Sequence, residues 1–153
     1  MVRVRSDDQI ADSKVKVRIR LDYKVETKPS KFFGSKNIEG LAEDLREQKV
    51  ALLRNVPIQG IQIEEIDMSS EVYVVKDDNS GNLVAYAPVL IIVNADSIDD
   101  LSRFIVVDEF RKIEILEPEE VYYSRLDLER FLFKTSQEIR QYKSEWERRA
   151  SQR

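Results

Sequence analysis

Residues 14–21 read KVKVRIRL, and this stretch decides the fold of the 153-residue chain. Apolar and basic side chains alternate along it with a period of two. Such alternation is typical of a β-strand that turns one face to a hydrophobic core and the other to water. We expect the strand to continue to Val25, with its cations on the outer face.

Two helices are predicted between this strand and residue 105. A loop over residues 27–36 separates the strand from the first helix, which Asn37 is placed to cap. Apolar residues on one face of this helix predict that it packs on the sheet. Ser97, with Asp100 three residues later, resembles a capping pair at the start of a short amphipathic helix.

Further strands are predicted where short stretches alternate or are continuously apolar. These stretches lie near residues 61–64, 72–75, 83–93 and 112–115. Residues 76–82 are polar and contain Gly81, as expected of a hairpin turn. Because residues 90–93 are apolar at every position, we expect burial on both faces of the sheet there.

The order of elements predicts an α+β domain with an antiparallel sheet. A β-α-β-β-α-β order is that of the ferredoxin-like arrangement, in which both helices lie on one face. The additional strand near Ile61 fits this order less well. We expect a flexible N-terminal segment at residues 1–13, the core domain at 14–123 and a long C-terminal helix at 124–153.

The composition narrows the chemistry that is open to the chain. It contains no histidine and no cysteine. Triads with an imidazole base, thiolate nucleophiles and metal sites with His or Cys ligands are therefore excluded. Carboxylate, lysine and tyrosine chemistry stay open, as does a magnesium site. No acidic cluster has a recognisable ligand spacing, so we expect no catalytic residues, no metal and no cofactor.

The sequence also indicates where the protein acts. No apolar run approaches the roughly 18 residues that a membrane span needs. The first residues lack the apolar centre of a signal peptide, and the absence of cysteine excludes a disulfide framework. We therefore expect a cytoplasmic protein that has no contact with membranes.

Charge is distributed unevenly along the chain. Residues 14–36 hold eight basic and two acidic residues, a net charge of +6, whereas residues 37–123 carry a net charge of −12. Residues 124–153 return to +3. A basic region on an acidic protein can still bind a phosphate backbone, because such binding depends on the local electrostatic field and not on the net charge of the protein.

The basic region therefore suggests a candidate nucleic-acid site on the first strand and the loop that follows it. Its residues are Lys14, Lys16, Arg18, Arg20, Lys31, Phe32, Phe33 and Lys36. Two simpler interpretations stay open. The strand cations can pair with Glu64 and other acids on neighbouring strands, and one of the phenylalanines can close the core instead of stacking on a base.

The C-terminal helix carries a stripe with the 4-3-4-3-4 spacing of a coiled-coil seam. The stripe residues predicted to contact a partner are Leu128, Leu132, Ile139, Tyr142 and Trp146. Thr135 occupies the remaining position of the seam, and this polar residue weakens the seam. A helix from Ser124 to Ala150 is about 40 Å long at 1.5 Å per residue, longer than one small sheet covers. Packing of the stripe on its own domain stays open as the alternative.

These observations favour a small non-enzymatic interaction or regulatory module. Its partner is expected to be a second copy, in a homodimer, or another protein. A nucleic-acid-binding domain is the alternative, and a magnesium-dependent enzyme or ligand-binding domain is a more distant one. Neither the biological process nor the identity of a partner is encoded in these residues.

Overall fold

A computed structural model describes residues 2–6, 9–27 and 35–152 of the chain. Its centre is an antiparallel sheet of five strands: β3 (Val15–Thr27), β4 (Ile61–Asp67), β5 (Tyr73–Lys76), β6 (Leu83–Ala95) and β7 (Phe110–Glu117). The strands follow the order β4-β6-β3-β7, and β5 also pairs with β6. Because β3 occupies the other side of β6 throughout, β4 and β5 share one edge of the sheet.

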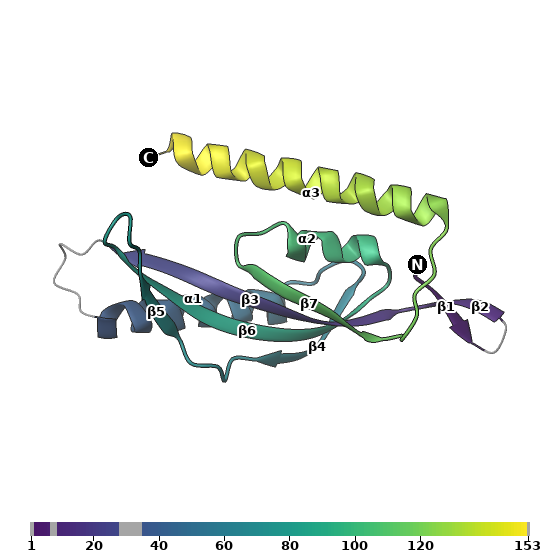
Figure 1. Ribbon diagram of the computed structural model, residues 1–153, viewed down its shortest axis with the longest axis horizontal. Helices are drawn as coiled ribbons and strands as arrows, with labels where there is room; N and C mark the ends of the chain where they lie inside the picture. The colour runs from purple at the N-terminus through teal and green to yellow at the C-terminus, as the bar shows by residue number, and fades with distance from the viewer. Residues whose placement is uncertain (1, 7–8, 28–34, 153) are drawn as a thin grey trace.

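Helices and a small hairpin surround this sheet. The helices are α1 (Ser35–Asn55), the 3-10 helix η1 (Ile98–Leu101), the single turn α2 (Ser102–Ile105) and α3 (Arg125–Ser151). Figure 1 shows α1 behind the strands, α3 running along the molecule above α2, and a hairpin projecting beyond one end. This hairpin is formed by β1 (Val2–Ser6) and β2 (Gln9–Ser13), which make a separate two-stranded sheet.

The hydrophobic core lies on one face of the sheet. The inward residues of β3, from Val15 to Tyr23, are buried together with those of β6. Val50 of α1, Leu101 of η1 and Phe104 of α2 join the same cluster. Both helical segments therefore pack on the face that the alternation of β3 predicts to be apolar.

The opposite face of the sheet carries the cations of β3. Leu90 and Ile92 of β6 lie on this face, opposite Arg20 and Arg18, and are only partly buried. The prediction that residues 90–93 are buried on both faces is therefore wrong. Only the alternate residues of this apolar stretch reach the core.

The helix starts also differ from the sequence prediction. Asn37 lies inside α1, which begins at Ser35, so it does not cap the helix. The side chain of Ser97 donates to Asp100 and caps no backbone group of η1. A capping box that we did not predict starts α3, where Ser124 and Asp127 bond reciprocally to each other's backbone N–H.

The predicted α+β class, antiparallel sheet and long terminal helix are confirmed. The hairpin turn over residues 76–82 is also present, with Gly81 at a φ of 72°. Residues 2–6 and 9–13, expected to belong to a flexible segment, form β1 and β2. No helix among the described residues is long and apolar enough to cross a membrane.

Candidate functional site

Helix α3 is a long element with little buried surface. None of its 27 residues is buried, although it packs against η1 and α2. Half of the large apolar side chains that the described part exposes lie on this helix. Soluble proteins rarely leave such a concentration of apolar surface without a use.

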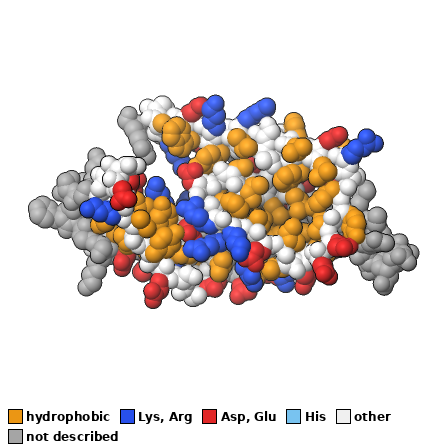
Figure 2. Space-filling model, viewed as in Figure 1, with side chains coloured by type: hydrophobic (Ala, Val, Ile, Leu, Met, Phe, Trp, Pro, Cys, Tyr) orange, Lys and Arg blue, Asp and Glu red, His pale blue; other side chains and the backbone are white. Residues whose placement is uncertain are grey.

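Four of the five residues predicted to contact a partner form an exposed stripe on α3. We call Leu128, Leu132, Ile139 and Trp146 the α3 stripe; their side chains are 49%, 66%, 52% and 59% exposed. At 100° per residue they lie within about 40° of one another around the helix. In the view of Figure 2, apolar side chains gather on both sides of a group of Lys and Arg side chains near the middle of the molecule.

The fifth predicted residue, Tyr142, lies on the side of α3 that faces its own domain. It is partly buried and forms a hydrogen bond with Asp108, in the loop before β7. Burial and this hydrogen bond raise the pKa of Tyr142 to about 12. Thr135 also lies inward, with its hydroxyl buried. The seam of the sequence prediction is thus divided between a side that faces the domain and the exposed α3 stripe.

The cations of β3 meet carboxylates on the open face of the sheet. Lys16 lies 3.0 Å from Glu64 of β4, and Arg18 lies 3.2 Å from Glu114 of β7. Lys14 is placed 3.7 Å from Asp96. The expected cross-strand pairing with Glu64 is therefore confirmed. These contacts leave less positive charge for a phosphate backbone than the sequence suggests.

The Lys16–Glu64 pair makes a testable electrostatic prediction. The hydrogen bond from Lys16 is the main reason that the pKa of Glu64 lies below its ordinary value. Lys16→Ala is expected to raise the pKa of Glu64, which NMR titration of the glutamate side chains measures. Because a lowered pKa stabilises the fold above the unfolded-state pKa, the contribution of the pair disappears as the pH falls through the folded value. An unchanged pKa in the variant would contradict this assignment.

A cluster on the same face is centred on Asp22, whose side chain is only 1% exposed. Arg20 donates to this carboxylate at 2.9 and 3.2 Å, and the Tyr73 hydroxyl donates at 2.6 Å. Arg111 lies 3.6 Å away and also covers the ring of Tyr86, which stacks on Tyr73. We call these five residues the Asp22 cluster. A buried carboxylate that already accepts from Arg20 and Tyr73 and lies beside Arg111 fits a structural role.

The Asp22 cluster was not predicted from the sequence, although one signal for it was present. Asp22 is an acidic residue at an outward position of β3, between the outward cations Arg20 and Lys24. The aromatic partners lie 51 and 64 positions further along the chain, and the pairing of β6 with both β3 and β5 brings them to Asp22. Of the predicted loop residues, Lys31, Phe32 and Phe33 lie outside the described residues. Lys36 is the second residue of α1.

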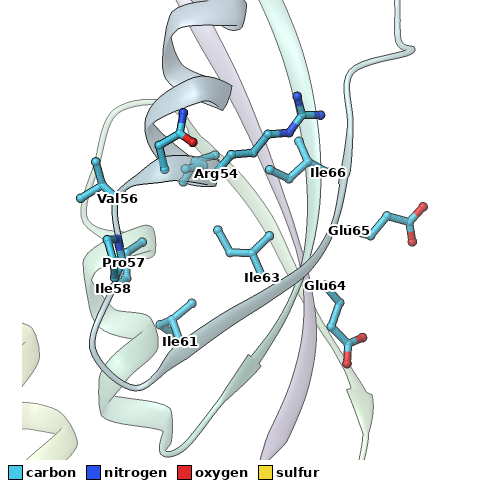
Figure 3. A pocket seen from close by; sticks show the side chains of 11 residues that line it. Arg54, Val56, Pro57, Ile58, Ile61, Ile63, Glu64, Glu65 and Ile66 are labelled. Carbon is cyan, nitrogen blue, oxygen red and sulfur yellow. The ribbon is translucent and has the colours of Figure 1, made fainter.

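Hollows on the described surface lie beside α3 and beside β4. One, of about 640 Å³, lies between the distal half of α3, α1 and the middle of β3, and its walls carry charges of both signs. The other, of about 570 Å³, lies between the end of α1 and β4 and is lined by both apolar and charged residues. Figure 3 shows this second hollow.

The described residues contain no group of three or more acidic side chains placed to hold a metal ion. Comparison with known proteins found no match among protein-family models, curated protein sequences or solved structures.

Proposed function

We propose that this protein is a non-enzymatic interaction module that forms a homodimer through the α3 stripe. We also propose that its core is ferredoxin-like. The strand order β7-β3-β6-β4 and the packing of α1 and α2 on one face support this fold. The fold hosts many unrelated functions and so does not itself indicate one.

The observation that carries the dimer proposal is the exposure of the α3 stripe along most of the helix. From Leu128 to Trp146 the stripe is about 27 Å long at 1.5 Å per residue. Each of its side chains is about half exposed or more, so the domain leaves much of their surface to solvent, although Trp146 also lines the hollow between α3, α1 and β3. A two-fold dimer uses the same surface on both copies, and one self-complementary stripe is sufficient for it.

The energetics of this contact fit a modest association. Burial of a large apolar side chain stabilises by about 1.5–3 kcal/mol before entropy is subtracted. Association of two chains costs roughly 4–15 kcal/mol of lost translational and rotational freedom. The burial of four such side chains from each copy would stabilise the dimer by more than the lower part of that cost. Trp146 is also of the residue type that most often anchors interfaces.

Sedimentation equilibrium of the intact chain and of Ile139→Asp tests the dimer. The intact chain is expected to dimerise, and the variant is expected to weaken the dimer by about thirtyfold, as for a loss of about 2 kcal/mol at an interface centre. Because Ile139 is half exposed, the thermal stability of the monomer should change by no more than about 0.5 kcal/mol.

Phe133→Asp is the matched control for this experiment. Phe133 is on the same helix and is 64% exposed, but it lies about 100° or more around the helix from the stripe. The Phe133→Asp variant should therefore leave the dimer intact. A monomeric intact chain, or an equal loss of association in both variants, would contradict the proposal. A large loss of monomer stability in Ile139→Asp would mean that the stripe packs on its own domain.

We place this proposal ahead of nucleic-acid binding because of the charges on β3. Lys16 and Arg18 are occupied by Glu64 and Glu114, and Arg20 is occupied by Asp22. A phosphate backbone has to compete with these carboxylates for the same cations. The α3 stripe has no comparable partner among the described residues.

A further inference from the structure

The hollow between the distal half of α3, α1 and β3 has the size of a small-molecule site. Its volume is about 640 Å³, and ligand pockets in proteins usually measure roughly 300–1,000 Å³. Its lining comes from α1, α3, β3 and the loop before β7. Because parts of the chain that are distant in sequence meet here, the hollow exists only in the folded domain.

One buried polar group in the lining of this hollow lacks a partner. Tyr23 is only 5% exposed, and its hydroxyl forms no hydrogen bond with any residue that the structure describes. Buried hydroxyl groups in native proteins normally have such a partner. Burial is the main reason that the pKa of Tyr23 lies above its ordinary value, and the nearby Glu109 carboxylate raises the pKa further. A polar group of a ligand in the hollow would supply the missing hydrogen bond.

Charges of both signs line the hollow without pairing with one another. Lys49 of α1 and Arg149 of α3 form no ion pair in the described part of the chain. The same holds there for Asp108 and Glu109, in the loop before β7. Both carboxylates and the Arg149 guanidinium influence the pKa of Tyr142, so they lie near its hydroxyl. Opposite charges therefore stand on separate elements around the hollow and stay available to a ligand.

The other charged residues of the lining already have partners. The pairs are Arg111 with Asp22 at 3.6 Å, Lys24 with Glu26 at 3.8 Å and Glu145 with Gln141 at 3.4 Å. A purely anionic ligand would meet the carboxylates of Asp108 and Glu109, and a purely cationic ligand would meet Lys49 and Arg149. A ligand that carries one charge of each sign avoids both repulsions.

Apolar side chains from two helices complete the lining. Leu45 of α1 and Trp146 of α3 both line the hollow. Trp146 is more than half exposed, so its indole ring is accessible to a ligand. An aromatic ring packs favourably against another ring in an offset or edge-to-face arrangement. The lining therefore favours a ligand that combines an aromatic ring with its charged groups.

We propose that this hollow binds a small zwitterion with an aromatic ring, of the size of an aromatic amino acid. The anionic group of the ligand lies between Lys49 and Arg149, and its ring lies against Trp146. Its ammonium group lies beside Glu109 and donates to the Tyr23 hydroxyl, which gives that buried oxygen a partner.

Trp146 is the only tryptophan of the chain, so its fluorescence reports on the site directly. The titration uses Ile139→Asp, which weakens the proposed α3 dimer and leaves the lining of the hollow unchanged, so the test does not depend on the dimer. L-Phenylalanine should change the emission saturably, with a Kd on the order of 1 mM. Phenethylamine lacks the carboxylate and 3-phenylpropionate lacks the ammonium group, so each should bind about tenfold more weakly. No saturable change up to about 20 mM phenylalanine, or an analogue that binds as tightly as phenylalanine, would overturn the proposal.

Substitutions in the lining assign each end of the ligand to its wall. Lys49→Ala should weaken the binding of phenylalanine about tenfold and leave that of phenethylamine unchanged, whereas Glu109→Gln should weaken phenylalanine and leave 3-phenylpropionate unchanged. Lys76→Ala, on β5 and outside the lining, is the control and should have no effect. Tyr23→Phe should weaken binding about fivefold without lowering Tm, because it removes a hydroxyl that has no partner in the fold. Unchanged binding in both Lys49→Ala and Glu109→Gln, or an equal loss in Lys76→Ala, would overturn the assignment of the site.

Discussion

Asp22→Ala is expected to lower the free energy of unfolding by about 3 kcal/mol, the lower end of the range for breaking a buried ion pair. The carboxylate is almost fully buried and holds Arg20, Tyr73 and Arg111. Without it, two guanidinium groups and a hydroxyl lose their acceptor. The effect falls at the lower end because Arg20 and Arg111 are 45% and 37% exposed and keep contact with water.

Thermal and urea unfolding measure this effect. For a chain of this size the loss corresponds to about 6–12 °C in Tm. Asp78→Ala, in the exposed turn between β5 and β6, is the control and should change stability by no more than about 0.5 kcal/mol. Asp22→Asn keeps the shape of the side chain and one acceptor oxygen, so its stability should lie between those of Asp22→Ala and Asp78→Ala. Equal stability of Asp22→Ala and Asp78→Ala would mean that the cluster contributes nothing to the fold.

Ile91→Ala is expected to cost about 3–4 kcal/mol, because it leaves a cavity in the centre of the core. Ile91 is fully buried and lies between Ile19 on β3 and Ile66 on β4. Ile92→Ala is a matched control from the next position of the same strand. Ile92 faces the open side of the sheet and is only partly buried, so its truncation should cost less than about 1.5 kcal/mol.

Urea unfolding of the two variants separates the faces of the sheet. If Ile92→Ala destabilises the protein as much as Ile91→Ala, then the open face is covered in solution. That result would point to a partner or a second copy lying on the cations of β3. The predicted difference between two neighbouring isoleucines is therefore a direct measurement of which face holds the core.

The main elements of the fold could be predicted because local patterns determine them. The alternation of β3 indicates both the strand and its inward face, and the polar turn at residues 76–82 indicates the hairpin. The burial of residues 90–93 was harder to predict. A continuously apolar stretch looks the same whether one face or both faces are covered, since coverage depends on where distant helices pack.

Less of the candidate sites could be predicted. The α3 stripe was found because its residues are close in sequence and repeat with the period of a helix. The Asp22 cluster joins β3, β5, β6 and β7, and its contacts follow from strand pairing that no local pattern encodes. The helix spacing also could not separate Tyr142, which faces its own domain, from Ile139, which does not.

The lack of any fully buried residue in α3 has a consequence for how the molecule opens. The helix is held by η1, α2 and a few contacts such as that between Tyr142 and Asp108, while the sheet and α1 share a separate buried cluster. Cooperative units in proteins follow the distribution of buried contacts. The chain therefore consists of a stable unit, formed by α1 and the strands, and a terminal helix that can detach at a much smaller free-energy cost. Detachment would uncover η1 and α2 while the rest of the domain stays folded.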